Sequence, residues 1–269
     1  MRRIITIASQ KGGVGKTTAA LNLGYSLSRL GGRVLIVDCD PQGGIAISSN
    51  LKKRTTKGLI DALKKECSAQ DIVMTTRENT LSIAGMGTME PEDVLFFEAE
   101  AASGRLKELL QSLCREYSYV LIDAPAGVGG IVTALLGASD GVIMVVQCKT
   151  LSLKTLPSFL KLVQWIRVNH NTSLHVDGVV FTMVDEQSPY ELQLFDEAKK
   201  MFPAEAFFRA TIPYDRLFEQ ASAKALPMAL LRDGKILGNA YMTLAMELKE
   251  RELRMEAGGE RDDNAEGLF

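Results

Sequence analysis

The chain carries a glycine-rich stretch, Lys-Gly-Gly-Val-Gly-Lys-Thr-Thr at residues 11–18, whose residue types suit phosphate binding. An apolar, β-branched run at residues 4–8 precedes it, and a helical pattern over residues 17–30 follows it. In such a unit, backbone N–H groups converge on phosphate oxygens, and the positive end of the helix favours their charge. The spacing predicts that Lys16 contacts the terminal phosphates and that Thr17 gives its hydroxyl to Mg²⁺.

Two other interpretations of the loop were weighed on the same residues. A glycine-rich turn that binds nothing would not need the Gly-Lys-Thr sequence at residues 15–17. A dinucleotide-binding loop would need its third glycine where Thr18 stands. A phosphate loop therefore explains these residues best.

Three aspartates that follow apolar runs are candidates for the chemistry beside this loop. Asp38 and Asp40 follow one run, and Asp123 ends another. Ligands of open α/β sheets bind at the carboxyl ends of the strands. Asp123 has the arrangement of a Walker B acid, which anchors Mg²⁺, and we assign Asp38 to the magnesium shell as well. The alternative for Asp38 and Asp40 is a solvated turn before Pro41.

These residues must be positioned by a sheet with helices on both faces. Apolar runs predict strands at residues 4–8, 33–37, 81–84, 119–122, 141–146 and 176–182, and periodic segments predict helices at residues 17–30, 104–116, 153–169 and 190–202. Their alternation predicts an α/β fold with a mostly parallel β-sheet. The run at residues 142–146 has no polar face, which is typical of a strand covered on both sides.

Length and composition favour one folded domain. The 269 residues are 46% hydrophobic and 24% charged, enough to bury a core without disulfides or a metal. We expect a single domain over residues 1–254 and a disordered acidic tail over residues 255–269. The four cysteines form no Cys-x-x-Cys pair, which predicts buried, reduced thiols.

Net charge and hydropathy limit which partners and which cellular location are expected. A net charge of -2 argues against coating nucleic acid by bulk charge, although a local basic patch is compatible with it. The apolar start is too short for a signal peptide, and no segment reaches the roughly 20 apolar residues of a membrane span. A cytoplasmic location is expected.

The glycine loop departs from the general Walker A pattern, because Gln10 replaces the first glycine and Lys11 adds a second lysine. This variant resembles the deviant Walker A loop of the ParA/MinD family of P-loop ATPases. The resemblance implies ATP and Mg²⁺ as cofactors and a P-loop fold. It also implies an ATP-bound sandwich dimer in which Lys11 reaches the partner subunit's nucleotide. On the residues alone, Lys11 could be a solvated loop charge.

The phosphate-binding residues are expected to be Lys11, Gly12, Gly13, Val14, Gly15, Lys16, Thr17 and Thr18.

The segment Asp-Cys-Asp-Pro-Gln-Gly at residues 38–43 resembles switch I of ParA-like proteins. It implies that Asp40 orients the attacking water, so that Lys11, Lys16 and Asp40 are the expected catalytic residues.

Glycines at residues 127, 129 and 130 suggest a mobile second switch, with a plain flexible loop as the alternative. Further along, two segments resemble strand ends that contact the adenine base in the family. Their candidates are Thr182, Met183, Pro213 and Asp215, which could also be ordinary strand ends.

The loop and switch resemble ParA more than MinD. MinD-type proteins end in a basic membrane-binding helix, whereas the last predicted helix here, residues 236–255, is charge-balanced. The resemblance implies an ATPase that alternates between an ATP-bound dimer and an ADP-bound or nucleotide-free monomer, and that partitions DNA or positions cargo. Hydrolysis is expected to be slow until a ParB-like or other partner stimulates it.

Nonspecific DNA is a further expected partner, with nucleoid association as its consequence. The family often has an arginine where Glu186-Gln187-Ser188 stands, and a second near Arg216. The densest basic run is Lys52-Lys53-Arg54 with Lys57, which could bind DNA or form a solvated face.

A MinD/FlhG-type regulator of division site or flagella, acting through a protein or membrane surface, is the alternative function. A reductase or metallocluster-assembly ATPase would need paired cysteines and has no support.

Overall fold

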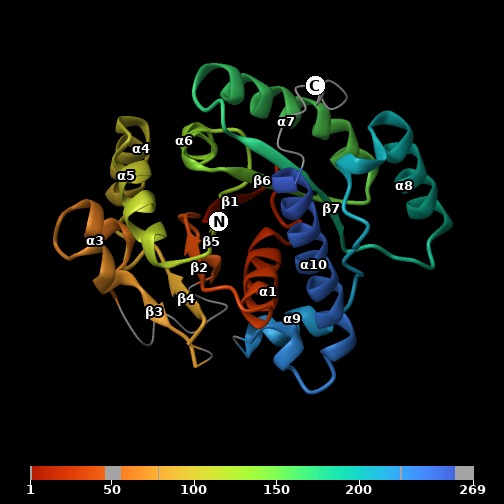
Figure 1. Ribbon diagram of the computed structural model, residues 1–269, viewed down its shortest axis with the longest axis horizontal. Coiled ribbons are helices and arrows are strands. Elements are labelled where there is room, and N and C mark those ends of the chain that lie inside the picture. Colours follow the sequence, from red (N-terminus) through yellow and green to blue (C-terminus); the bar gives the residue numbers. More distant parts are fainter. Residues whose placement is uncertain (1, 46–55, 78, 225, 258–269) are drawn as a thin grey trace.

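Seven strands form one sheet in the computed structural model, which describes residues 2–45, 56–77, 79–224 and 226–257 (Figure 1). The order is β3-β4-β2-β5-β1-β6-β7, and all neighbours pair in parallel except β3 with β4. The strands are β1 (Arg3–Ala8), β2 (Val34–Asp38), β3 (Met74–Thr75), β4 (Leu81–Ala84), β5 (Tyr119–Asp123), β6 (Gly141–Gln147) and β7 (His175–Thr182). The predicted α/β fold with a mostly parallel sheet is confirmed.

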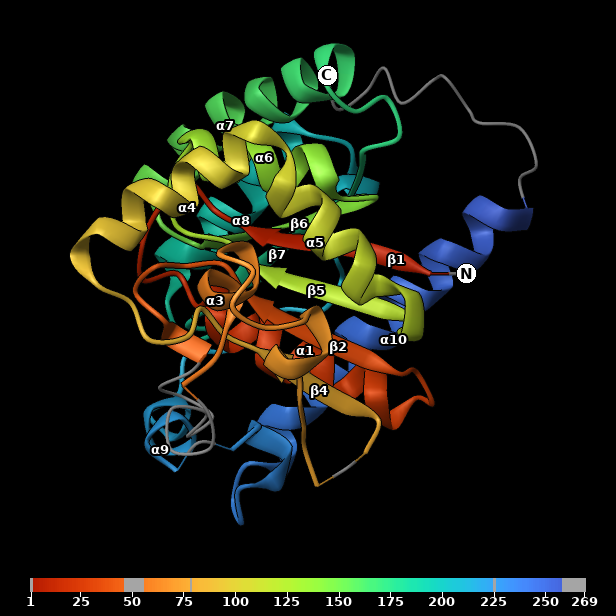
Figure 2. The ribbon, with the colours of Figure 1, turned by 90° about the vertical axis from the view of Figure 1, so that its left-hand side faces the viewer.

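Helices cover both faces of this sheet (Figures 1 and 2). Helices α1 and α10 pack on one face, while α4, α5, α6 and α7 cover the other. The described helices are α1 (Lys16–Arg29), α3 (Leu59–Leu63), α4 (Pro91–Ser103), α5 (Arg105–Leu113), α6 (Gly130–Ala138), α7 (Thr150–Asn169), α8 (Pro189–Met201), α9 (Leu217–Ala223) and α10 (Lys235–Ala257). Central strands β1, β2 and β5 are buried at every residue, which explains their lack of a polar face.

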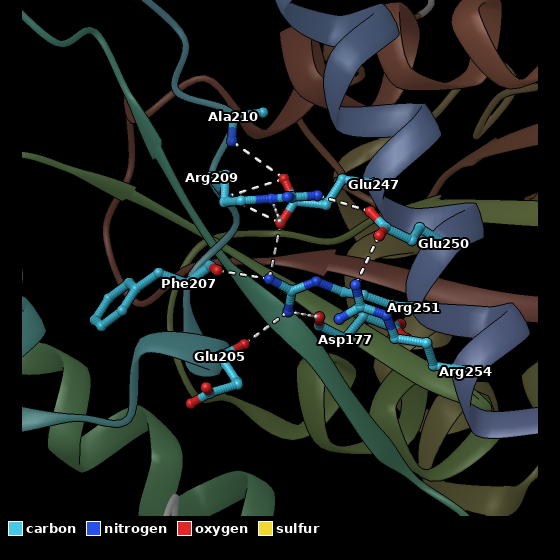
Figure 3. Close-up of polar contacts among 9 residues, drawn as sticks. All are labelled: Asp177, Glu205, Phe207, Arg209, Ala210, Glu247, Glu250, Arg251 and Arg254. Atoms are coloured by element: carbon cyan, nitrogen blue, oxygen red, sulfur yellow. Dashed lines mark hydrogen bonds and ion pairs between the residues drawn. The ribbon is translucent and has the colours of Figure 1, made fainter. Parts of the chain in front are cut away.

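Helix α10 is fastened to the β7 edge by a polar network (Figure 3). The segment at residues 206–212 runs beside β7, where Phe208 N–H donates to the Val179 carbonyl. Glu247 accepts the N–H groups of Arg209 at 2.9 Å and Ala210 at 3.2 Å. Arg251 donates to the carbonyls of Asp177, Glu205 and Phe207. The helix thus satisfies backbone groups that a further strand would otherwise pair.

Six predicted strands and the predicted helices are present with small shifts at their ends. The helix predicted at residues 104–116 is α-helical only to Leu113 and then continues as a 3₁₀ turn at Cys114–Glu116. Helix α10 continues to Ala257, three residues into the predicted tail, whose remainder lies outside the described residues. Helices α3, α4, α6 and α9 and the short strand β3 were not predicted. No helix in the described part of the chain is both long and apolar enough to span a membrane.

Candidate functional site

The phosphate loop joins β1 to α1 and depends on two left-handed glycines. Gly13 has φ 72° and Gly15 has φ 88°, a region that residues with a Cβ rarely adopt. Gly15 is also the N-cap of α1 and offers no side chain to its N–H groups. The first amides of a helix have no intrahelical acceptor, so this end is open to an anion.

A cleft of about 890 Å³ lies over this loop at the carboxyl ends of the strands. The loop contributes glycines, Lys16, Thr17 and Thr18, and the turn after β2 contributes Asp40 and Pro41. Gly129 and Gly130 line it from the N-terminus of α6, so that two helix N-termini face one cleft. Such an arrangement suits a polyphosphate.

Lys16 is the cation of this cleft. It is 7% exposed, and burial lowers its pKa, although Asp123 and Asp40 partly oppose that shift. Water screens a buried ammonium group less than an exposed one. A bound anion therefore stabilises the charged form of Lys16 more than it would stabilise an exposed lysine. The role of Lys16 at the terminal phosphates stays a prediction.

Asp123 ends β5 and is fully buried. Neither of its carboxylate oxygens has a well-formed hydrogen bond within the described chain, although the Thr17 hydroxyl lies near enough to favour the charged form. Burial first, and the neighbouring Asp38 second, raise the pKa of Asp123 to about 7. A buried carboxylate without partners beside a hydroxyl fits Mg²⁺, which takes one or two protein oxygens together with phosphate oxygens.

Asp38 is the register partner of Asp123 on β2, but its oxygens are already engaged. One accepts the N–H of Asp40 at 3.1 Å, and the other accepts the N–H of Ile45 at 2.9 Å. The carboxylate therefore folds the loop over residues 40–45 against the strand end. The predicted place of Asp38 beside the metal is compatible with this, but its hydrogen bonds are to the loop.

Asp40 stands at the mouth of the cleft. Its carboxylate accepts the N–H of Gln42 at 3.0 Å, and its carbonyl accepts the N–H of Gly43, which closes a turn. The side chain is partly exposed and lines the cleft together with Lys16. A carboxylate in this position can hold a water beside the terminal phosphate.

Lys11 lies apart from the cleft, whose walls contain every other predicted loop residue except Val14, which is buried in the core. It borders a small pocket between the loop and α7, and its N–H faces the Ser9 hydroxyl at 3.3 Å. Within the described chain, Lys11 is thus absent from the walls of the cleft. The structure brings Lys16, Thr17, Asp40 and Asp123 together and leaves Lys11 outside.

The four predicted base contacts are placed differently from one another. Met183 has φ 53° and lines the cleft. Thr182 is buried, and its hydroxyl donates to the Val14 carbonyl at 2.7 Å. Pro213 bridges to Val184, and the Asp215 carboxylate accepts the N–H of Leu217. Of these four residues, only Met183 is among the described residues that line the cleft.

Sequence reasoning missed several residues of the cleft. Val94 and Glu98 come from α4, Ile131 from α6 and Ser222 from α9. The start of α4 carries a readable signal, because Pro91 is at the first turn and Asp93 accepts the N–H of Glu90 at 2.9 Å. Helix α6 could not be predicted from the sequence, because the glycines before Ile131 are typical of a loop.

The described residues contain no group of three or more His, Cys, Asp or Glu side chains placed to hold a metal. All four cysteines are free thiols. Cys39 and Cys148 are buried as predicted, whereas Cys67 and Cys114 are only partly buried. The predicted basic run at residues 52–54 lies outside the described residues.

Known proteins resemble this chain over nearly its whole length. A family model described as an AAA domain matches residues 2–176. The sporulation initiation inhibitor protein Soj of Bacillus subtilis is 32% identical over 250 residues, which are 92% of this chain and 98% of Soj. The chromosome partitioning protein ParA of Caulobacter vibrioides is 32% identical over 262 residues, 95% of this chain and 97% of that protein.

The fold is shared with a solved structure of the septum site-determining protein MinD of Pyrococcus horikoshii, in complex with Mg-ADP. The TM-score is 0.77 at 24% identity, with 97% of this chain and 100% of that chain covered. The phosphate loop, the Walker B aspartate and the similarity to Soj and ParA lead to one assignment. The chain belongs to the ParA/MinD family of P-loop ATPases.

Proposed function

We propose that this chain binds ATP with Mg²⁺ in the cleft and acts as a ParA-like switch that partitions DNA or positions cellular cargo. The observation that carries the proposal is the unpartnered, buried Asp123 carboxylate beside Lys16 and Thr17. Soj and ParA, named for sporulation control and chromosome partitioning, support the cellular role, and the Mg-ADP bound to MinD supports the ligand.

The proposed metal site uses Thr17 and Asp123, with Asp38 behind them. Bound Mg²⁺ would neutralise charge on the phosphates. Strand β5 fixes the position of Asp123, and Asp38 holds the neighbouring turn through its two hydrogen bonds to main-chain N–H groups. The glycines and Val14 to Thr18 would hold the phosphates through main-chain N–H groups, while Met183 borders the base side.

Asp40 is the proposed water-positioning residue. It is the carboxylate at the cleft mouth, and the turn to Gly43 fixes it opposite Lys16. The described residues of the cleft walls include no arginine, and a lone carboxylate implies slow hydrolysis, which a ParB-like or other partner would accelerate. Asp40→Ala is expected to bind ATP but not to hydrolyse it.

Lys11 is the proposed contact to a second copy of the chain. It lies beyond the walls of its own cleft, so its charge is available to a nucleotide in the partner subunit. The switch would then alternate between an ATP-bound dimer and an ADP-bound or nucleotide-free monomer. We place the monomer in the cytoplasm and the dimer on nonspecific DNA.

A positioning regulator of the MinD/FlhG kind is the second candidate. It is favoured by Glu186-Gln187-Ser188, which replaces an expected arginine, and by the exposed Met246 and Leu253 on α10. In this case the dimer would bind a protein or membrane surface in place of DNA. A basic, membrane-binding C-terminal helix is not what α10 offers, because its acidic and basic residues balance.

Calorimetric titration of ATP with Mg²⁺ tests the ligand. Lys16→Ala is expected to lose about a hundredfold or more in ATP affinity, because a charge-assisted contact to phosphate is removed inside a desolvated cleft. Lys11→Ala is the matched control for ATP binding by the monomer, since it removes a lysine of the same loop whose proposed contact is to the partner subunit's nucleotide. Equal ATP affinity of wild type and Lys16→Ala would contradict the assignment.

A further inference from the structure

Two side chains from the sheet hold carbonyl groups of the phosphate loop. Thr182, the last residue of β7, donates its hydroxyl to the Val14 carbonyl at 2.7 Å. Gln147, the last residue of β6, donates its side-chain N–H to the Gly13 carbonyl at 3.4 Å. Thr182 is 2% exposed, so its bond is shielded from water. Consecutive peptide groups of the loop are therefore tied to consecutive strands of the sheet.

The two contacts determine where the amides of the loop point. In a planar trans peptide, the carbonyl and the following N–H point in opposite directions. A Val14 carbonyl held toward β7 turns the N–H of Gly15 away from β7. A Gly13 carbonyl held toward β6 does the same for the N–H of Val14. Gly15 lines the cleft, so its N–H is an amide that a phosphate would use.

Met183 closes the arrangement from the same side. Its backbone is left-handed, with φ 53°, and it follows Thr182 directly at the end of β7. Its terminal methyl lies 3.7 Å from the point that a Cβ on Gly15 would occupy, and its sulfur accepts from Gln147 at 2.7 Å. The ends of β6 and β7 thus contact three successive residues of the loop.

We propose that Thr182 is a positioning residue of the phosphate loop, assisted by Gln147, and that it acts on phosphate binding and not on the base. The proposal rests on the proposed function, ATP binding in the cleft. It replaces the base contact expected for Thr182, because the hydroxyl is committed to Val14. Glycine peptides rotate freely, and a loop whose carbonyls are not held spends less time with its amides aimed at phosphate.

The substitution Thr182→Val keeps the shape of the side chain and removes the hydroxyl. It leaves the buried Val14 carbonyl without its donor, so the peptide can rotate out of its phosphate-binding orientation. Realigning it on binding would cost up to the energy of the lost hydrogen bond, which is about tenfold to a hundredfold in phosphate affinity. Thr182→Ser retains the hydroxyl and should bind nearly as the wild type does. Gln147→Ala removes the longer bond, and a loss of only about threefold is expected.

The experiment compares two probes by calorimetry, ATP and inorganic tripolyphosphate, each with Mg²⁺. A positioning role predicts that Thr182→Val weakens both by the same factor, since both are bound by the loop. The matched control is Thr6→Val, which removes another buried strand hydroxyl, bonded to Ser139 at 2.7 Å, away from the loop carbonyls. It should lower thermal stability without changing tripolyphosphate affinity.

Two results would overturn the proposal. One is a loss of ATP affinity with unchanged tripolyphosphate affinity, which would make Thr182 a base contact. The other is unchanged affinity for both probes. If Thr182→Val does not fold, Gln147→Ala decides by the same comparison. Failure of the wild type to bind ATP would instead contradict the proposed function itself.

Discussion

At the residue scale, Asp38 and Asp123 show how neighbouring carboxylates acquire different roles. They are register partners on adjacent strands, and both are fully buried. Asp38 is satisfied by the N–H groups of Asp40 and Ile45, whereas Asp123 has no such donors within the described chain. An unsatisfied buried charge costs stability, which a binding site can recover when its ligand arrives.

The substitution Asp123→Asn tests this cost. In the absence of Mg²⁺ at pH 8, above the raised pKa of about 7, we expect the free energy of unfolding to rise by about 1–3 kcal/mol, because a buried charge is removed. The affinity for ATP should at the same time lose its dependence on Mg²⁺. Denaturant titration measures the first effect and calorimetry the second.

Asp38→Asn is the control with the opposite sign. It weakens two backbone hydrogen bonds and should lower the free energy of unfolding by about 1–3 kcal/mol. The assignment of Asp123 to the metal is contradicted if Asp123→Asn lowers stability as Asp38→Asn does and keeps the Mg²⁺ dependence.

Local sequence could predict Lys16, Thr17 and Asp123, because a phosphate loop and an acid at a strand end are contiguous patterns. The structure places Lys16 and Thr17 in the walls of the cleft, with the buried Asp123 beside them. The partners of Thr182 could not be predicted, since its bond spans 168 positions to Val14. The same holds for Asp38, whose bond to Ile45 depends on how a loop folds.

At the element scale, α10 contributes by fastening a segment of the sheet edge. Glu247 is 5% exposed and accepts main-chain N–H groups from Arg209 and Ala210, while Arg251 binds the carbonyls of the same segment (Figure 3). That segment continues to Ile212, whose N–H bonds to Phe181 of β7. The helix therefore stabilises the strand end that carries Thr182 and Met183.

Glu247→Gln should lower the free energy of unfolding by about 2 kcal/mol at pH 7, because hydrogen bonds to a carboxylate are replaced by weaker ones. Burial alone would raise the pKa of Glu247, but the N–H groups of Arg209 and Ala210 and the Arg251 guanidinium hold it below its usual range. A lowered pKa gives stability that is present above the unfolded value, about 4.3, and lost as pH falls through the folded value.

The difference between wild type and Glu247→Gln should therefore shrink in acid. Denaturant titrations between pH 7 and pH 3 measure it. Glu250→Gln, an exposed position one turn away, is the control and should change stability by less than about 0.5 kcal/mol. A gap between wild type and Glu247→Gln that is constant with pH would show that the charge is not responsible.

Periodicity predicted the long elements well and the short or glycine-flanked ones poorly. Helices α1, α7, α8 and α10 have clear apolar faces and lie within three residues of their predicted ends. Helix α6 follows several glycines, and α3 is only five residues long, so neither presents a full period. Both are formed by packing against the sheet, which local sequence does not report.

At the scale of the whole molecule, the position of Lys11 is informative. It borders a pocket beside α7, apart from the cleft that Lys16 occupies. A second copy whose cleft faces this loop would bring Lys11 to the other nucleotide. The division into one domain at residues 1–254 with a tail remains a prediction.

DNA binding by the ATP-loaded dimer is the prediction with the widest consequence. The Asp40→Ala dimer should retard long duplex DNA at low salt, with log K falling linearly against log salt by about 0.9 per phosphate contacted. Arg216, exposed at the start of α9, should account for about one unit of this slope, and Arg216→Ala tests it. If the dimer binds anionic vesicles and not DNA, the positioning function replaces partition.

The most direct measurement is the mass of Asp40→Ala in solution by light scattering, with ATP or ADP and Mg²⁺. The account predicts twice the chain mass with ATP and the single mass with ADP. Lys11→Ala in the same background should bind ATP and keep the single mass, because the lysine that reaches the partner's nucleotide is gone. A single mass for ATP-loaded Asp40→Ala, or a dimer that forms equally well without Lys11, would contradict the switch.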